Sequence, residues 1–261
     1  HTINVDGNIS TTGEKATGVN VGSSNSNITI SGDITTVGYT GPAHSAINVI
    51  GDSNTITVSG KVEATDTLQS EYYDAIVVSS RSNATTFNLN SGSSVVGGFD
   101  NQGTNTTITN QGTIDVLSNT GSIATLNNLQ SGLTYDSNTY SSNKYLPVNY
   151  NIIINSPTEY GSMSLSGIVL GRTTFGFDTT NSTGIKGGNY SSIFSNMAPY
   201  SLTNTSGTIG DRHWFIVDSG SESISLDLNI SYAGDQSITS NISTTGNYGY
   251  GFWMKENDSS T

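Results

Sequence analysis

The sequence predicts an all-β protein that begins as a parallel β-helix of stacked short-strand rungs and continues into a smaller β-rich, sandwich-like domain. Three observations support this prediction. The pattern apolar-x-apolar-x-Gly-x-apolar recurs along the first half of the 261-residue chain. Charged residues make up only 11 % and hydrophobic residues only 33 %, with Gly, Ser, Thr and Asn filling the remainder. Ile, Val and Thr are abundant and there are 13 Tyr, which favours ordered β-structure over disorder.

The repeat occurs five times, over residues 3–9, 28–34, 56–62, 87–95 and 108–114. Alternation of apolar and polar residues places one side chain inward and the next outward, as in a strand. Each glycine is expected at a tight bend between two strands, where positive φ or a missing Cβ is needed. The repeat glycines are Gly7, Gly32, Gly60, Gly92 and Gly112. Turn-forming asparagines are expected before the first strand of successive repeats, at Asn25, Asn54, Asn83 and Asn105.

A single repeat is too short to bury its own apolar face. Stacked repeats form a continuous aliphatic core, with strands of successive rungs pairing about 4.8 Å apart. A second apolar pair between glycines, at positions 19/21, 47/49 and 76/78, adds a further strand to three of the repeats. The alternative is a β-sandwich of hairpins, which does not impose a recurring glycine unit.

The repeat pattern ends near residue 128, and we expect three segments along the chain. Residues 1–128 form the β-helix, residues 129–232 a β-rich C-terminal or capping domain, and residues 233–261 a return to a β-helix-like rung. Within the middle segment, residues 135–145 are expected to be a loop and residues 190–194 a short helical turn. Strands are expected at 150–154, 163–166, 174–177, 214–217 and 224–230, the last two forming a hairpin.

Short motifs in the second half carry a family resemblance. They are Tyr150-Asn151-Ile152-Ile153-Ile154-Asn155-Ser156-Pro157, Tyr160-Gly161, Phe175-Gly176-Phe177, Gly188-Asn189-Tyr190-Ser191-Ser192-Ile193, Trp214 and Val217. With the upstream repeats, these motifs resemble the passenger domains of bacterial autotransporter-like outer-membrane proteins of the β-helical adhesin type. The resemblance implies export to the bacterial cell surface, and a C-terminal region that helps the passenger fold or caps the β-helix.

The two ends of the sequence are related. Residues 241–246 (NISTTG) repeat residues 8–13, and the last residues followed by the first read like an internal rung. We therefore expect units to continue one another's β-helix head to tail, either as tandem repeats of a giant adhesin or as subunits of a filament. A chance match between Thr/Asn-rich rungs, or an arbitrary chain end, is the alternative. The expected inter-unit contacts are His1, Thr2, Ile3, Val5, Ile238, Ile242, Phe252, Trp253 and Met254.

Charge and hydropathy restrict the partners and the location. The formal net charge is −12 with only 8 Lys and Arg, so we expect no binding to nucleic acid or anionic membranes. No stretch reaches the about 18–20 apolar residues of a membrane-spanning helix. The chain starts with His and contains no Cys, which fits a processed or excised piece of an exported protein. The expected location is extracellular, at the bacterial cell surface.

No catalytic, cofactor-binding or metal-binding residue is predicted, and we do not expect an enzyme. Residues 215–221 resemble an aspartic-protease motif, but the second Asp-Ser/Thr-Gly that this chemistry needs is missing, so a turn after a strand is expected. Asp211, Arg212 and His213 are adjacent and point apart, which excludes a preformed triad. The three histidines lack metal-ligand spacing. The eight basic residues are scattered and none is expected beside an Asp cluster, as a polysaccharide lyase requires.

Aromatic side chains are the candidate ligand contacts. Tyr135, Tyr140, Tyr145, Tyr248 and Tyr250 lie in segments rich in Asn and Gly, which suits sugar stacking or protein contacts. The alternative is packing against the protein's own sheet. The function we expect is an extracellular structural or adhesive spacer or fibre unit, whose receptor is a surface glycan or protein. A carbohydrate-binding or carbohydrate-degrading β-helix is the alternative, and an aspartic protease is the third possibility.

Overall fold

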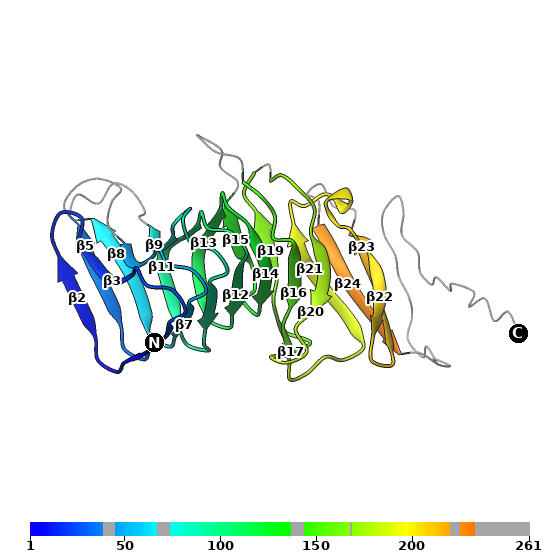
Figure 1. The fold of residues 1–261 in the computed structure, drawn as a ribbon. Coiled ribbons are helices and arrows are strands. Elements are labelled where there is room, and N and C mark those ends of the chain that lie inside the picture. Colours follow the sequence, from blue (N-terminus) through cyan, green and yellow to red (C-terminus); the bar gives the residue numbers. More distant parts are fainter. Residues whose placement is uncertain (39–44, 67–73, 137–143, 168, 220–224, 233–261) are drawn as a thin grey trace, which may run out of the picture.

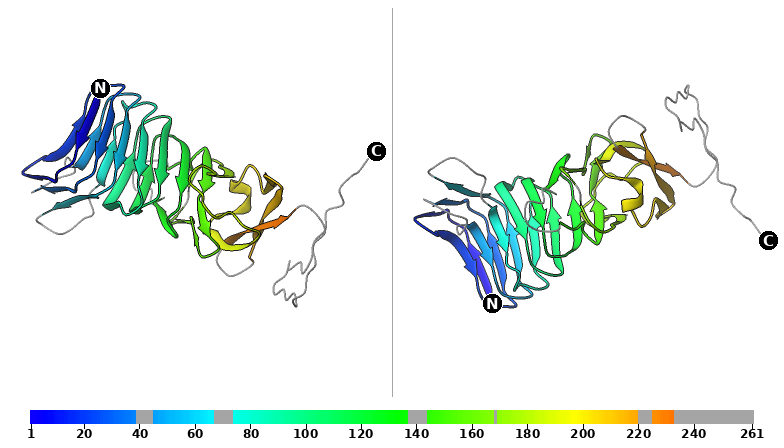
Figure 2. Two further views of the ribbon diagram at one scale, coloured as in Figure 1. Left: turned by 90° about the horizontal axis from the view of Figure 1, so that it is seen from below. Right: turned by 90° about the horizontal axis from the view of Figure 1, so that it is seen from above.

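The computed structural model describes residues 1–38, 45–66, 74–136, 144–167, 169–219 and 225–232. These residues form an elongated stack of strands that runs from the N-terminus to a twisted sheet near residue 232 (Figure 1; Figure 2). Parallel pairing between successive rungs confirms the predicted all-β parallel β-helix. No helix among the described residues is long and apolar enough to cross a membrane.

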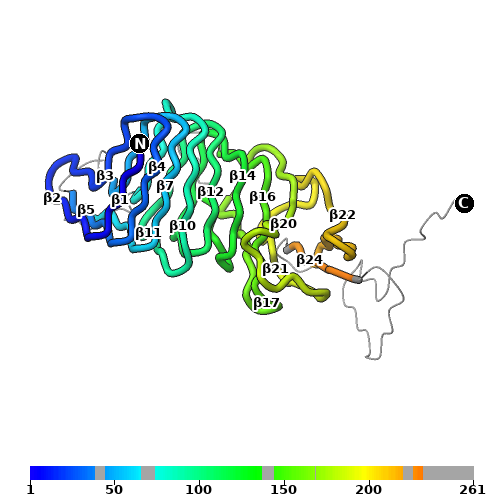
Figure 3. Tube along the Cα trace, turned by 60° about the horizontal axis from the view of Figure 1, so that its bottom comes forward, coloured from blue at the N-terminus to red at the C-terminus, as the bar shows by residue number. Residues whose placement is uncertain are grey.

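The first sheet is an uninterrupted ladder of eight parallel strands, which lie side by side in Figure 3. Every neighbouring pair is parallel, with registers that place equivalent repeat positions opposite each other. The strands, in spatial order, are β1 (Thr2–Val5), β4 (Asn27–Ile30), β7 (Thr55–Val58), β10 (Thr86–Leu89), β12 (Thr106–Asn110), β14 (Ile123–Asn128), β16 (Asn149–Ile152) and β20 (Thr174–Phe177).

The second sheet lies across the core from the first and is also parallel over most of its length. Its parallel strands, in spatial order, are β2 (Ile9–Thr12), β5 (Ile34–Gly38), β8 (Lys61–Asp66), β11 (Ser94–Asn101), β13 (Thr113–Asn119), β15 (Leu133–Asp136), β19 (Met163–Leu165) and β21 (Gly188–Ser195). A third stack joins it through β11, formed by β3 (Thr17–Val21), β6 (Ser45–Val49) and β9 (Asp74–Val78). These three strands contain the second apolar pairs of the repeat.

The pairing becomes antiparallel at β21, and this change marks the capping end of the stack. The cap has the order β21-β24-β23-β22, with β22 (Ser206–Ile209), β23 (Arg212–Asp218) and β24 (Ser225–Tyr232). The expected final hairpin is confirmed by the antiparallel pair β23–β24. A small hairpin, β17 (Ile154–Ser156) with β18 (Glu159–Tyr160), and a 3₁₀ turn, Pro199–Ser201, complete the described elements.

The parallel stack does not stop at residue 128. β14 pairs with β16, and β16 with β20, in the same register as the earlier rungs. The inward position held by Ile28 and Ile56 is taken by Tyr150 and Phe175 in these later rungs. The later rungs lack the glycine that follows the apolar pair in the earlier repeats, so the sequence pattern ends although the stack continues. The expected helical turn at 190–194 is also wrong, because these residues lie in β21.

Each repeat glycine lies at the bend between a strand of the first sheet and the following strand of the second sheet, as predicted. At Gly32 a Cβ would come within 2.4 Å of the Gly7 carbonyl oxygen, and at Gly60 within 2.3 Å of the Gly32 carbonyl oxygen. Neither position has positive φ, whereas Gly92 has φ +86° with open space around it. Stacked bends therefore require glycine mainly because successive turns of the chain touch each other.

A column of left-handed residues precedes the strands of the first sheet. Asn25, Ser53, Ala84 and Asn105 have φ between 53° and 57° and occupy equivalent register positions. Asn54, which we expected in a turn, is 1 % exposed; its side chain accepts from Ser26 N and donates to Ser23 O. Asparagine therefore has two uses here, as a turn residue and as a buried connector between rungs.

Candidate functional site

The predicted inter-unit residues fall into two groups. Thr2, Ile3 and Val5 lie on β1, the outermost strand of the first sheet among the described residues, and Ile3 is 47 % exposed. The amino group of His1 donates to Asn25 O over 3.2 Å. The remaining predicted contacts, Ile238, Ile242, Phe252, Trp253 and Met254, lie outside the described residues.

Tyr135 is not a surface residue, which corrects the prediction of a ligand contact in a loop. It lies on β15, is fully buried, and donates from its hydroxyl to Tyr145 O over 2.6 Å. Burial raises the pKa of its phenol well above the ordinary value. Tyr145 remains 39 % exposed and is available to a ligand. Tyr140, Tyr248 and Tyr250 lie outside the described residues.

A cluster of carboxylates with one lysine lies on the second sheet. Asp100, Ser118 and Asp136 occupy one register column across β11, β13 and β15. The ammonium of Lys144 donates to Ser118 Oγ and lies 3.8 Å from Asp136 Oδ2. We call Asp74, Asp100, Asp136 and Lys144 the Asp/Lys cluster. The expectation that no basic residue lies beside an Asp cluster is therefore wrong, because the fold brings Lys144 back over β13 and β15.

Asp74 is the member of the Asp/Lys cluster whose surroundings raise its pKa. It lies at the start of β9, and Gly98 of β11 is its register partner. Partial burial and the neighbouring Asp100 raise the pKa of Asp74 to about 6, opposed by the charge of Lys144. A Cβ at Gly98 would come within 2.1 Å of the Asp74 side-chain oxygen, so glycine makes room for this carboxylate.

The cluster combines groups that acid–base chemistry uses. A carboxyl group with a raised pKa, such as Asp74, can donate a proton near neutral pH. Carbohydrate-cleaving sites use such an acid together with a second carboxyl group nearby. Among the described residues, no group of three or more acidic or histidine side chains is placed to hold a metal ion.

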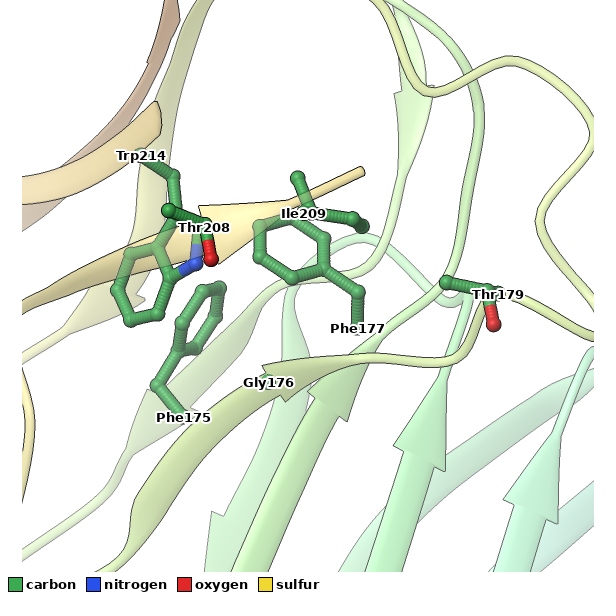
Figure 4. Close-up of a pocket in the computed structure, with 7 residues that line it drawn as sticks. All are labelled: Phe175, Gly176, Phe177, Thr179, Thr208, Ile209 and Trp214. Carbon is green, nitrogen blue, oxygen red and sulfur yellow. The ribbon is translucent and has the colours of Figure 1, made fainter. Parts of the chain in front are cut away.

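An aromatic pocket lies where the β-helix meets the antiparallel cap (Figure 4). Trp214 of β23 packs on Phe175 and Phe177 of β20, with ring centroids 5.2 and 5.7 Å apart. The open hollow has a volume of about 310 Å³, and the hydroxyl-bearing residues Thr179 and Thr208 lie at its margin. Trp214 is only 5 % exposed, so the partly buried Phe177 and Ile209 provide the apolar surface that a ligand would meet.

The remaining residues considered for catalysis lie on the cap. Arg212 and His213 begin β23 and Asp218 ends it, where it is the register partner of Leu226 on β24. The protease-like motif is thus the end of a strand, and residues 220–224 lie outside the described part. The Asp/Lys cluster was missed because its members are up to 70 residues apart in the sequence and meet only through strand register.

Comparison with known proteins found no matching family model, no matching curated protein and no matching solved structure.

Proposed function

We propose that this chain is an extracellular structural or adhesive protein, a rigid β-helical spacer or fibre unit at the bacterial cell surface. The observation that carries the proposal is the uninterrupted parallel ladder of eight strands from β1 to β20. Seven intervals of about 4.8 Å give a rod of about 34 Å for this part alone. The resemblance to autotransporter passengers supports the proposed location.

The physical basis of rigidity is a core and a backbone ladder that both run along the stack. Buried aliphatic side chains such as Ile30, Val58 and Leu89 are fully covered and occupy successive rungs. Each rung also donates backbone hydrogen bonds to the rung before it, as from Ser31 N to Val5 O and from Ser59 N to Ile30 O. Bending the rod would break both sets of contacts, so the stack suits a spacer.

Head-to-tail association is the second part of the proposal. Among the described residues, β1 has a paired neighbour on one side only, and Ile3 on it is exposed. An unpaired strand edge with an exposed apolar residue is a template for a further strand. The chain end of a second copy is the partner we propose for this edge.

Electron microscopy and a surface assay test the two parts. We expect purified protein to form rods whose length increases with concentration, and we expect Ile3→Lys to return them to single units. A signal-peptide fusion expressed in a Gram-negative host is expected to be accessible to antibody on intact cells. Dispersed monomers at all concentrations contradict head-to-tail association, and a strictly intracellular protein contradicts the proposed location.

Carbohydrate cleavage or binding is a second candidate function, favoured by the Asp/Lys cluster and by the aromatic pocket. A panel of acidic and neutral polysaccharides, assayed for reducing ends and for unsaturated uronate products, tests cleavage. Under this candidate, Asp136→Asn abolishes product release, whereas Asp211→Asn, whose side chain is 80 % exposed outside the cluster, leaves it unchanged. A glycan array tests binding, with Phe177→Ala expected to weaken it. No product from any polysaccharide and no glycan bound would contradict this candidate.

A further inference from the structure

The outward face of the first sheet carries a repeating array of hydrogen-bonding side chains. Two alternate residues of each strand point outward, and on the strands from β4 to β16 the residues between and after them are buried. In the order β1 to β20 these pairs read Thr-x-Asn, Asn-x-Thr, Thr-x-Thr, Thr-x-Asn, Thr-x-Thr, Thr-x-Asn, Asn-x-Asn and Thr-x-Gly. Strand register aligns them in two columns, which we call the Thr/Asn array.

The Thr/Asn array contains no charged side chain, although the protein has a net charge of −12. The second sheet differs, since its outward residues include the ion pair of Lys61 with Glu63 at 2.7 Å and the Asp/Lys cluster. Solubility alone would favour charges on both faces. The first sheet therefore excludes charge from its outward face whereas the second sheet does not, and this difference needs its own explanation.

Bonds between rungs hold the side chains of the Thr/Asn array in place. Asn151 Nδ2 donates to Asn127 Oδ1 over 2.9 Å, and Asn127 Nδ2 donates to Thr109 Oγ1 over 3.1 Å. Between β7 and β10, Asn88 Nδ2 donates to Thr57 Oγ1 over 3.5 Å. Groups fixed in this way lose little conformational entropy when they bind an ordered partner.

The two spacings of the Thr/Asn array select the partner. Neighbouring columns of a strand are about 6.6 Å apart and neighbouring rungs about 4.8 Å apart. In ice, tetrahedral hydrogen bonds of about 2.75 Å place second-neighbour oxygens about 4.5 Å apart, and the stacking repeat is about 7.3 Å. The rung spacing of about 4.8 Å and the column spacing of about 6.6 Å each differ by about a tenth or less from the ice spacings of about 4.5 Å and about 7.3 Å. Water molecules bound by the threonine and asparagine groups can therefore continue into an ice crystal.

We propose that the Thr/Asn array is an ice-binding surface, on which the protein adsorbs to the lattice of solid water. The absence of charge fits this partner, because a charged group orients water around itself and not in a tetrahedral lattice. A second copy is a poorer occupant, since an array about 34 Å long and roughly 10 Å wide covers less than half of the about 800 Å² per partner of a stable interface. A polysaccharide is also poorer, because the array offers no aromatic ring for a sugar to stack on.

Partition into growing ice tests the proposal with two matched variants. Thr107 lies at the centre of the Thr/Asn array on β12, and Thr35 is a partly buried outward threonine on β5 of the second sheet. We expect wild type and Thr35→Tyr to enter a slowly growing ice hemisphere, to shape ice crystals and to inhibit recrystallisation. The tyrosine ring of Thr107→Tyr holds the array off the lattice, and this variant is expected to lose these effects several-fold.

Circular dichroism melts establish that both variants are folded. If Thr107→Tyr does not fold, Thr57→Lys replaces it as the array variant and Thr35→Lys becomes its control. Exclusion of the wild-type protein from ice would overturn the proposal, as would equal loss in the array and control variants. Binding to microcrystalline cellulose without binding to ice would assign the array to a polysaccharide instead. A dimer in sedimentation that Thr107→Tyr abolishes would assign it to a second copy.

Discussion

Asn101 lies directly beneath Asn119 in the stack, and its side-chain amide donates to the Asn119 side-chain oxygen over 2.8 Å. Both residues are fully buried. This bond is part of a series of hydrogen bonds, because Thr106 Oγ1 donates to Asn101 Oδ1 and Asn119 Nδ2 donates to Tyr145 O. These asparagines satisfy buried polar groups at the bends of successive rungs.

Asn119→Leu is expected to destabilise the protein strongly. The substitution removes the side-chain acceptor of the Asn101 amide, which keeps Gly103 O, and one of the two donors to the Tyr145 carbonyl, which keeps the Tyr135 hydroxyl. Losing these buried hydrogen bonds costs about 1–3 kcal/mol. Urea unfolding followed by circular dichroism measures the change. Asn48→Ala is the matched control, because its amide donates to Asn20 in an exposed ladder on the third stack, and we expect a loss below about 1 kcal/mol. Equal losses would contradict the role of burial.

Gly60→Ala is expected to lower the free energy of unfolding by about 1–3 kcal/mol or more, because its Cβ would lie 2.3 Å from the Gly32 carbonyl oxygen. Gly22→Ala provides the comparison, since a Cβ there meets nothing within 4 Å and φ is not positive. Thermal melts of both variants check the prediction. A neutral Gly60→Ala would mean that successive turns of the chain are not in contact.

The sequence predicted the early rungs well because their inward residues are aliphatic and each bend carries a glycine. It failed after residue 128 because the rungs of Tyr150 and Phe175 keep the register of the stack but lack the glycine of the earlier bends. The Asp/Lys cluster was not predictable, since Lys144 meets Ser118 and Asp136 only in the folded stack. The Thr/Asn array likewise depends on register, and only strand pairing shows that its columns are continuous.

Asp74→Asn is expected to stabilise the protein at pH 8. The native pKa of Asp74 is about 6, above its ordinary value of 3.8, so the native state binds more protons than the unfolded state between these values. Stability therefore falls as pH rises from about 4 to about 6, and the cost of the charged form persists above this window. Replacing the carboxylate with an amide removes this cost, which the rise from 3.8 to about 6 puts at up to about 3 kcal/mol at pH 8.

The same substitution is expected to leave stability unchanged at pH 3, where Asp74 is protonated in both states. Urea unfolding at the two pH values gives the comparison, and Asp211→Asn controls for loss of an exposed charge. A gain of the same size at both pH values would show that packing, rather than ionisation, makes the difference.

Trp214→Ala is expected to loosen the cap while leaving the early rungs intact. The indole covers Phe175 and packs beneath Gly207, where a Cβ would meet the ring at 2.8 Å. Truncation of a buried tryptophan costs about 3–5 kcal/mol. Hydrogen exchange is expected to accelerate in β22–β24 and to stay slow in β7–β12, because each rung contacts mainly its neighbours. Uniform acceleration along the whole stack would contradict this local coupling.

The continuity of the rod is tested most directly by a distance between two spin labels. The chain contains no cysteine, so Asn27→Cys and Thr174→Cys introduce the only two labelling sites. These residues occupy one outward column on β4 and β20, six rung intervals apart, which predicts a narrow distribution of backbone separations centred near about 29 Å. A broad distribution, or a mean far from this value, would show that the chain beyond residue 128 leaves the stack, and would contradict the single continuous β-helix.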